Sequence, residues 1–69
     1  MSARSDACRR AIALLERGGS LGCELLSQIV ADCNDLAFLR SRIHSGFAPA
    51  NNRQRIVAIL VLQAVIDGE

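Results

Sequence analysis

The sequence predicts an all-α fold, with a short N-terminal helix followed by an antiparallel helical hairpin that dimerises through its C-terminal helix. Three observations lead to it: apolar residues recur at helical spacing in two segments, glycines separate these segments, and an apolar run covers residues 56–66. A chain of 69 residues has room for one domain, so residues 1–69 are predicted to form a single small helical domain.

The first helix is predicted over about residues 5–17. Ser5 can cap its start, and the spacing of Cys8, Ala11 and Leu15 places them on one face. Gly18 and Gly19 follow the last periodic position and end the helix. This segment is the shortest of the three predicted helices.

The second helix is predicted over about residues 20–45. Its apolar side chains fall within about 80° of one another around the helix axis. They form the stripe Leu25, Ile29, Leu36, Leu39 and Ile43. A repeat of seven residues within this stripe favours antiparallel packing against another helix, which we expect to be the third one.

The third helix is predicted over about residues 52–67. Gly46 suits the position just after helix two, and Pro49 keeps Ala48 extended in the connecting turn. Asn51 followed by Gln54 resembles a capping arrangement, which places the start of the helix at about Asn52. The pattern therefore predicts a hairpin whose turn spans residues 46–51.

The apolar run at residues 56–66 has large apolar side chains on every side of the helix. Such a helix must be covered on more than one side. We expect one side to pack on helix two and the other to meet a second copy of the chain. The residues predicted for this dimer interface are Val57, Val61, Leu62 and Val65. Six of the eleven residues are β-branched, so a buried strand is the alternative.

Length and composition favour an oligomer in the cytoplasm. A chain this short buries only about 60% of its unfolded surface and usually needs disulfides, a metal or a partner. Cys8, Cys23 and Cys33 are an odd number without Cys-x-x-Cys spacing, which argues against a secreted disulfide framework. The start resembles no signal peptide, and eleven apolar residues are too few to span a bilayer. Eight Arg without Lys suggest a bacterial or phage source.

No enzyme, metal or cofactor signature is present, so we expect a non-enzymatic protein without a cofactor. Cys33 and His44 share a helical face but lie about 16 Å apart along its axis. Asp32 and Asp35 could form a carboxylate pair but lack a neighbouring base. The Gly-rich stretch at residues 18–22 follows a helix rather than a strand and lacks the Lys of a phosphate loop.

Positive charge gathers at the predicted hairpin end. Residues 40–55 contain no acidic residue, and their basic side chains are Arg40, Arg42, His44, Arg53 and Arg55. This cluster can meet an acidic protein surface. It also supports the alternative function of a dimeric nucleic-acid-binding transcriptional regulator, because polar residues that can read base edges lie at the helix start. A membrane-active peptide is a third and weaker interpretation.

Phe38 lies on the polar side of predicted helix two, and an aromatic among charged groups is typical of a protein interface. The predicted partner-binding residues are Phe38, Arg40, Arg42, Phe47, Arg53 and Arg55. We expect a small interaction protein: a regulator that inhibits, sequesters or chaperones a protein partner, for example an anti-activator. Residues 36–66 resemble in layout the helical-hairpin co-chaperones of type III secretion needle subunits. The shared features are a helix ending in Ser-Gly, a turn and an apolar last helix.

Overall fold

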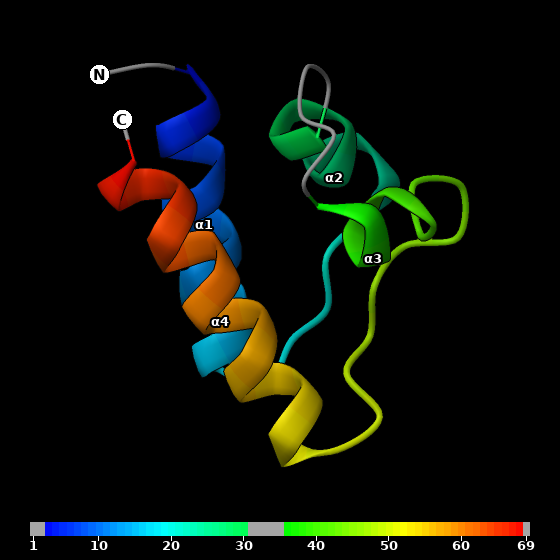
Figure 1. Cartoon of the computed structure of the whole chain (residues 1–69). Helices are drawn as coiled ribbons and strands as arrows, with labels where there is room; N and C mark the ends of the chain where they lie inside the picture. The colour runs from blue at the N-terminus through cyan, green and yellow to red at the C-terminus, as the bar shows by residue number, and fades with distance from the viewer. Residues whose placement is uncertain (1–2, 31–35, 69) are drawn as a thin grey trace.

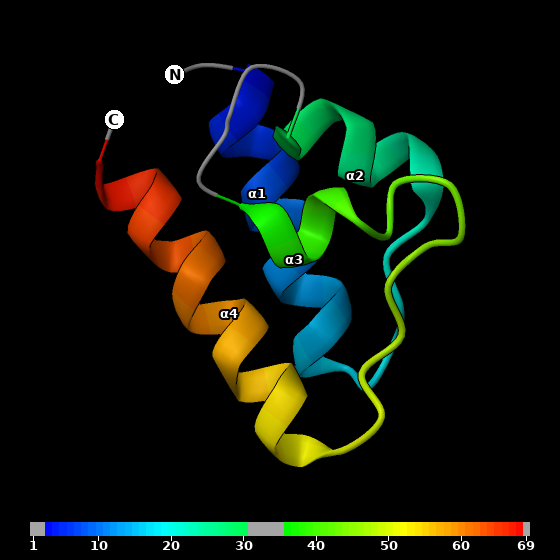
Figure 2. The ribbon, with the colours of Figure 1, turned by 45° about the vertical axis from the view of Figure 1, so that its right-hand side comes forward.

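The computed structural model describes residues 3–30 and 36–68, and these residues form helices joined by turns. The helices are α1 (Ala3–Glu16), α2 (Cys23–Val30), α3 (Ala37–Arg40) and α4 (Asn52–Asp67). Helices α1 and α4 run antiparallel side by side, while α2 and α3 lie together beside them (Figures 1 and 2). The prediction of an all-α fold is confirmed for the described residues.

Helix α1 begins at Ala3, so Ser5 lies within the helix and the prediction that it caps the start is wrong, whereas the end at Glu16 is within one residue of its prediction and forms a Schellman motif. The Gly19 amide donates to the Leu14 carbonyl at 2.8 Å, and the Gly18 amide donates to the Leu15 carbonyl at 3.0 Å. Gly18 adopts a φ of 80°, in the left-handed region that a residue without Cβ enters at little cost. The Gly-rich stretch at residues 18–22 therefore begins with a helix stop.

Helix α4 also begins where the sequence predicts. The Asn51 side chain accepts a hydrogen bond from the Gln54 amide at 2.9 Å, and Gln54 Oε1 accepts one from the Ala50 amide at 2.9 Å. These bonds satisfy backbone donors at the helix start, which would otherwise lack partners. The alternative of a buried strand over residues 56–66 is wrong.

The predicted single helix over residues 20–45 is wrong. Residues 20–22 precede α2, Leu36 is not helical, and residues 41–45 form turns that end at Gly46, whose φ is 82°. An unbroken helix of that length would measure about 39 Å, whereas the longest dimension of the molecule is 29 Å. Two short helices instead bury their apolar faces over the same core. The predicted stripe of Leu25, Ile29, Leu36, Leu39 and Ile43 is nevertheless buried or partly buried as expected.

The predicted pairing of the last two long helices is also corrected, because α4 packs on α1 and has no backbone contact with the described part of α2 or α3. The fully buried apolar residues of the two helices are Ala7, Cys8, Ala11 and Leu15 of α1 and Ala58 and Leu62 of α4.

Helix α2 is held on the other side of α1 by packing and by two arginines of α1. Arg4 Nε donates to the Ile29 carbonyl at 3.1 Å, and Arg10 donates to the Gln28 side chain at 2.8 Å. The ends of the α2–α3 segment meet in an isolated antiparallel bridge between Leu21 and Phe47. Their amides and carbonyls exchange two hydrogen bonds, of 2.8 and 2.9 Å. Helix α3 packs on α2 and lies opposite the start of α4.

Candidate functional site: a pocket between α3 and α4

A pocket of about 470 Å³ lies between α3, the turn that follows it and the first two turns of α4. Its apolar walls come from Phe38 of α3, Phe47 of the connecting segment and Val57 of α4. Two arginines, Arg42 and Arg53, also line it. The fold therefore brings together four of the six residues predicted to bind a partner.

Phe38 and Phe47 form one apolar wall. Their ring centroids are 6.0 Å apart and the ring planes are inclined by 83°, an edge-to-face arrangement favoured by aromatic quadrupoles. Phe47 is 8% exposed, whereas Phe38 is 39% exposed. Phe47 is thus a buried support, and Phe38 presents the accessible aromatic surface that the sequence analysis expected.

Val57 forms the facing wall and is 46% exposed. The sequence analysis placed Val57 in a dimer interface and did not associate it with Phe38. The two residues lie nineteen positions apart in the printed sequence, on different helices, and no local pattern links them. Only the antiparallel docking of α4 on α1 brings the Val57 face toward α3.

Arg42 and Arg53 give the pocket a positive rim. Both are exposed, and no acidic residue lines the pocket. In the described part of the chain, the only salt bridge joins Arg9 to Asp6 of α1. The guanidinium groups of Arg42 and Arg53 are therefore available for an anionic group that enters the pocket.

The other polar residues of the pocket are engaged in local hydrogen bonds. Ser41 Oγ donates to the Phe38 carbonyl at 2.9 Å, and Asn51 and Gln54 cap α4 as described above. These bonds hold the turn after α3 and the start of α4 in place. The guanidinium groups of Arg42 and Arg53 therefore supply most of the hydrogen-bond donors that the pocket walls can offer to a partner.

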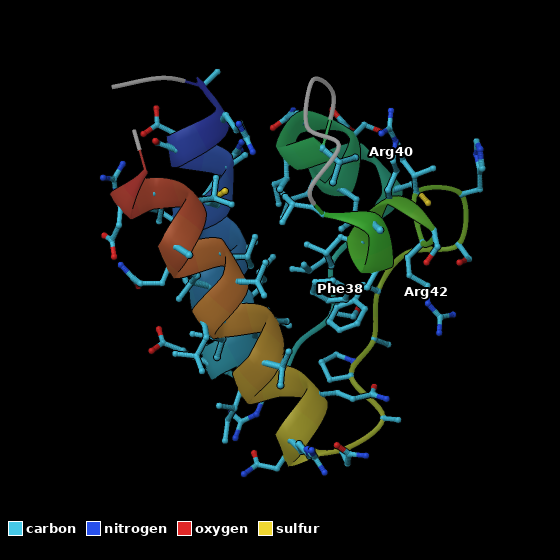
Figure 3. All side chains as sticks on the ribbon, viewed as in Figure 1. Phe38, Arg40 and Arg42 are labelled. Carbon is cyan, nitrogen blue, oxygen red and sulfur yellow. The ribbon has the colours of Figure 1, made fainter. Side chains whose placement is uncertain are left out.

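Arg40 and Arg55, the other two predicted partner-binding residues, do not line this pocket. Figure 3 shows Arg40 pointing away from Phe38 of α3 and from Arg42 of the following turn, the two residues that line the pocket. Arg55 is half-buried and donates to the Asn52 side chain within the first turn of α4. The basic cluster over residues 40–55 is therefore divided between different faces of the molecule.

The outer face of α4 is apolar and exposed. Ile56 and Leu60 are 46% and 62% exposed, and they stand one helical turn apart next to Val57. Among the predicted interface residues, Val61 and Val65 are partly buried against the core. Leu62 is fully buried within the chain, so its assignment to a dimer interface is corrected. The periodicity of an all-apolar helix does not reveal which side faces its own core.

The remaining predicted chemistry finds no assembled site in the described residues. Cys8 is buried in the core and Cys23 is exposed. Cys33, Asp32 and Asp35 lie outside the described residues. Across residues 3–30 and 36–68, no three His, Cys, Asp or Glu side chains gather in a way that could hold a metal ion. None of the helices in the same ranges combines the length and apolar character needed to cross a bilayer.

Comparisons with protein-family models, with curated proteins and with solved structures found no match to this chain. The pocket and the exposed face of α4 are therefore the features from which a function can be inferred.

Proposed function

We propose that this chain is a small non-enzymatic protein–protein interaction protein, a regulator that binds and inhibits, sequesters or chaperones a protein partner. The observation that carries the proposal is the pairing of exposed apolar walls, Phe38 and Val57, with the free arginines Arg42 and Arg53 in one pocket. Aromatic and arginine side chains around an apolar recess are the composition of interface hot spots.

The pocket is better suited to a macromolecular segment than to a small substrate. It is formed by an α3–α4 gap at the surface, and its polar side chains are arginines and helix-capping groups. A side chain of the partner can insert between Phe38 and Val57 while its neighbours meet Arg42 and Arg53. We accordingly place the partner surface at the pocket.

We also propose that the chain forms a homodimer through the outer face of α4, with Ile56 and Leu60 taking the place of Leu62. Burying the exposed half of such a side chain contributes about 1 kcal/mol. Association costs about 4–15 kcal/mol, so these side chains from two copies at best offset the lower end of that cost, and the dimer forms only at high protein concentration. The odd number of cysteines without Cys-x-x-Cys spacing and the Arg-rich composition favour a cytoplasmic setting in a bacterium or phage-infected cell.

The alternative of a nucleic-acid-binding regulator has less support. It relies on four arginines acting together, and the fold separates Arg40 and Arg55 from the pair that lines the pocket. Binding to nucleic acid would weaken steeply with salt, with a slope set by the number of phosphates contacted. A mobility-shift titration on random duplex DNA at low salt separates this alternative from protein binding.

The proposed function is tested by affinity capture from the native host with three baits: the unmodified chain, Phe38→Ala and Arg17→Gln. Arg17 is exposed and lies outside the pocket, so Arg17→Gln controls for a surface substitution elsewhere on the molecule. A partner identified by mass spectrometry should be retained by Arg17→Gln and lost by Phe38→Ala. Retention of every captured protein by Phe38→Ala contradicts the proposal.

A further inference from the structure

We propose that the α3–α4 pocket is a receptor for an acidic segment of a partner protein, in which one aromatic or large aliphatic side chain is flanked by carboxylates. This inference rests on the proposed function and specifies the chemistry of the partner. The anchor side chain enters between Phe38 and Val57, and the flanking carboxylates meet Arg42 and Arg53.

The apolar part of the recess suits an aromatic or large aliphatic anchor side chain. The volume of about 470 Å³ lies within the range of about 300–1,000 Å³ that is usual for ligand sites. Phe38 already meets Phe47 edge to face, and its remaining exposed surface can make a second aromatic or aliphatic contact. An aromatic or large aliphatic side chain therefore gains more from this recess than a small or polar one.

The positive charges of Arg42 and Arg53 complement carboxylates on both sides of the anchor. Arg42 and Arg53 approach the recess from two separate segments, the turn after α3 and the first turn of α4. Among the residues that line it, none is acidic, and Ser41, Asn51 and Gln54 are held by local hydrogen bonds. Guanidinium groups bind carboxylates in a planar bidentate geometry. A segment with acidic groups on both sides of the anchor matches two arginines placed in this way.

The backbone around the recess supports a preformed receptor. The Leu21–Phe47 bridge positions Phe47, and the Asn51 cap positions the first turn of α4, which carries Arg53. Both features are satisfied without a ligand. The cost of ordering the receptor on binding is therefore low, and the affinity follows the contacts that the segment makes.

The test uses fluorescence anisotropy with a fluorescein-labelled peptide that carries one Phe flanked on both sides by Asp. Two matched peptides replace the Asp residues with Asn or the Phe with Ala. The full chain should bind the first peptide in a salt-sensitive manner and should bind each control at least about tenfold more weakly. Equal binding of the Asn peptide overturns the acidic specificity, and equal binding of the Ala peptide overturns the anchor.

Protein variants assign the binding to the pocket. Arg42→Gln and Arg53→Gln should each weaken binding of the acidic peptide by about fivefold, and Phe38→Ala should weaken it by at least about tenfold. Arg17→Gln should leave it unchanged, because Arg17 lies outside the pocket. An equal loss with Arg17→Gln means that the peptide responds only to overall charge, and this result overturns the inference.

Other occupants give distinct results. Shifts of the Phe38 and Arg42 amide NMR signals, on the α3 side of the pocket, on dilution of the protein alone would assign the pocket to a second copy. Displacement of the peptide by an oligonucleotide at equal concentration would assign it to nucleic acid. Either result overturns the inference. If the peptide fails to bind below about 1 mM while a partner is still captured through Phe38, the inference fails and the proposed function stands.

Discussion

The rings of Phe38 and Phe47 meet edge to face with their centroids 6.0 Å apart, although the two residues differ in exposure. Phe47 is anchored by the backbone bridge to Leu21, so it holds the accessible ring of Phe38 beside the arginines. Phe47 contributes to the core, and Phe38 contributes to the exposed wall of the pocket. Substitutions at the two positions should therefore have different effects.

Phe38→Ala should lower the free energy of unfolding by only about 1 kcal/mol, the value of an exposed aromatic contact. Phe47→Ala should cost about 3–5 kcal/mol because it leaves a cavity in the core. Thermal unfolding followed by circular dichroism measures both, at about 4–8 °C per kcal/mol for a chain of this size. Equal losses for the two variants would place Phe38 in the core.

Leu60→Arg and Leu62→Arg should separate the surface of α4 from its core. Leu60 is 62% exposed, so an arginine there keeps the helix folded and disrupts the proposed dimer. Leu62 is fully buried, and an unpaired charge there should unfold the chain. Size-exclusion chromatography with light scattering, together with circular dichroism, reports both outcomes. A folded Leu62→Arg protein would contradict the packing of α4 on α1.

Asn51→Ala should destabilise the protein by about 0.5–2 kcal/mol, because the Gln54 amide loses its acceptor at the start of α4. Asn51→Asp is the matched control, since a carboxylate accepts the same hydrogen bond and suits the positive end of the helix. Urea unfolding should rank Asn51→Asp close to the unmodified chain. An equal loss for both variants would show that the cap contributes little.

Gly46→Ala should be more damaging than Gly18→Ala. Both glycines have a φ near 80°, so a Cβ costs about 1–2 kcal/mol of backbone strain at either position. A Cβ at Gly46 would also lie 3.0 Å from the Leu21 carbonyl oxygen, whereas one at Gly18 meets nothing within 4 Å. The difference in unfolding free energy between the two variants isolates this clash. Equal values would mean that the Leu21 carbonyl moves aside freely.

The sequence predicts the outer elements well because their signals are local. The start of α4 follows from Asn51 and Gln54, and the end of α1 follows from Gly18 and Gly19, within one or two residues. Apolar spacing likewise identifies the buried stripe from Leu25 to Ile43. Such signals depend only on residues within a few positions of each other.

The pairing of helices could not be predicted in the same way. Apolar periodicity shows that a face is buried, and it does not show which helix covers it. The seven-residue repeat of the stripe favours the last helix as its partner, whereas α4 packs on α1. The pocket depends on that pairing. Phe38 and Arg42 were therefore identified as candidates singly, and their association with Val57 needed the structure.

The bridge between Leu21 and Phe47 has a consequence for the order of folding. Helices α1 and α4 contact each other although a long stretch of sequence separates them. Closing so long a loop costs entropy, which slows the docking of the two helices. Once the bridge closes, only residues 17–20 and 48–51 separate it from the two helices. We expect a disrupted bridge to slow folding more than it speeds unfolding, as stopped-flow measurements on Gly46→Ala, whose Cβ crowds the Leu21 carbonyl oxygen of the bridge, would register. With these two backbone hydrogen bonds in place, only short segments connect α1 and α4 to the bridge, so the docking of α4 on α1 becomes a nearly local step.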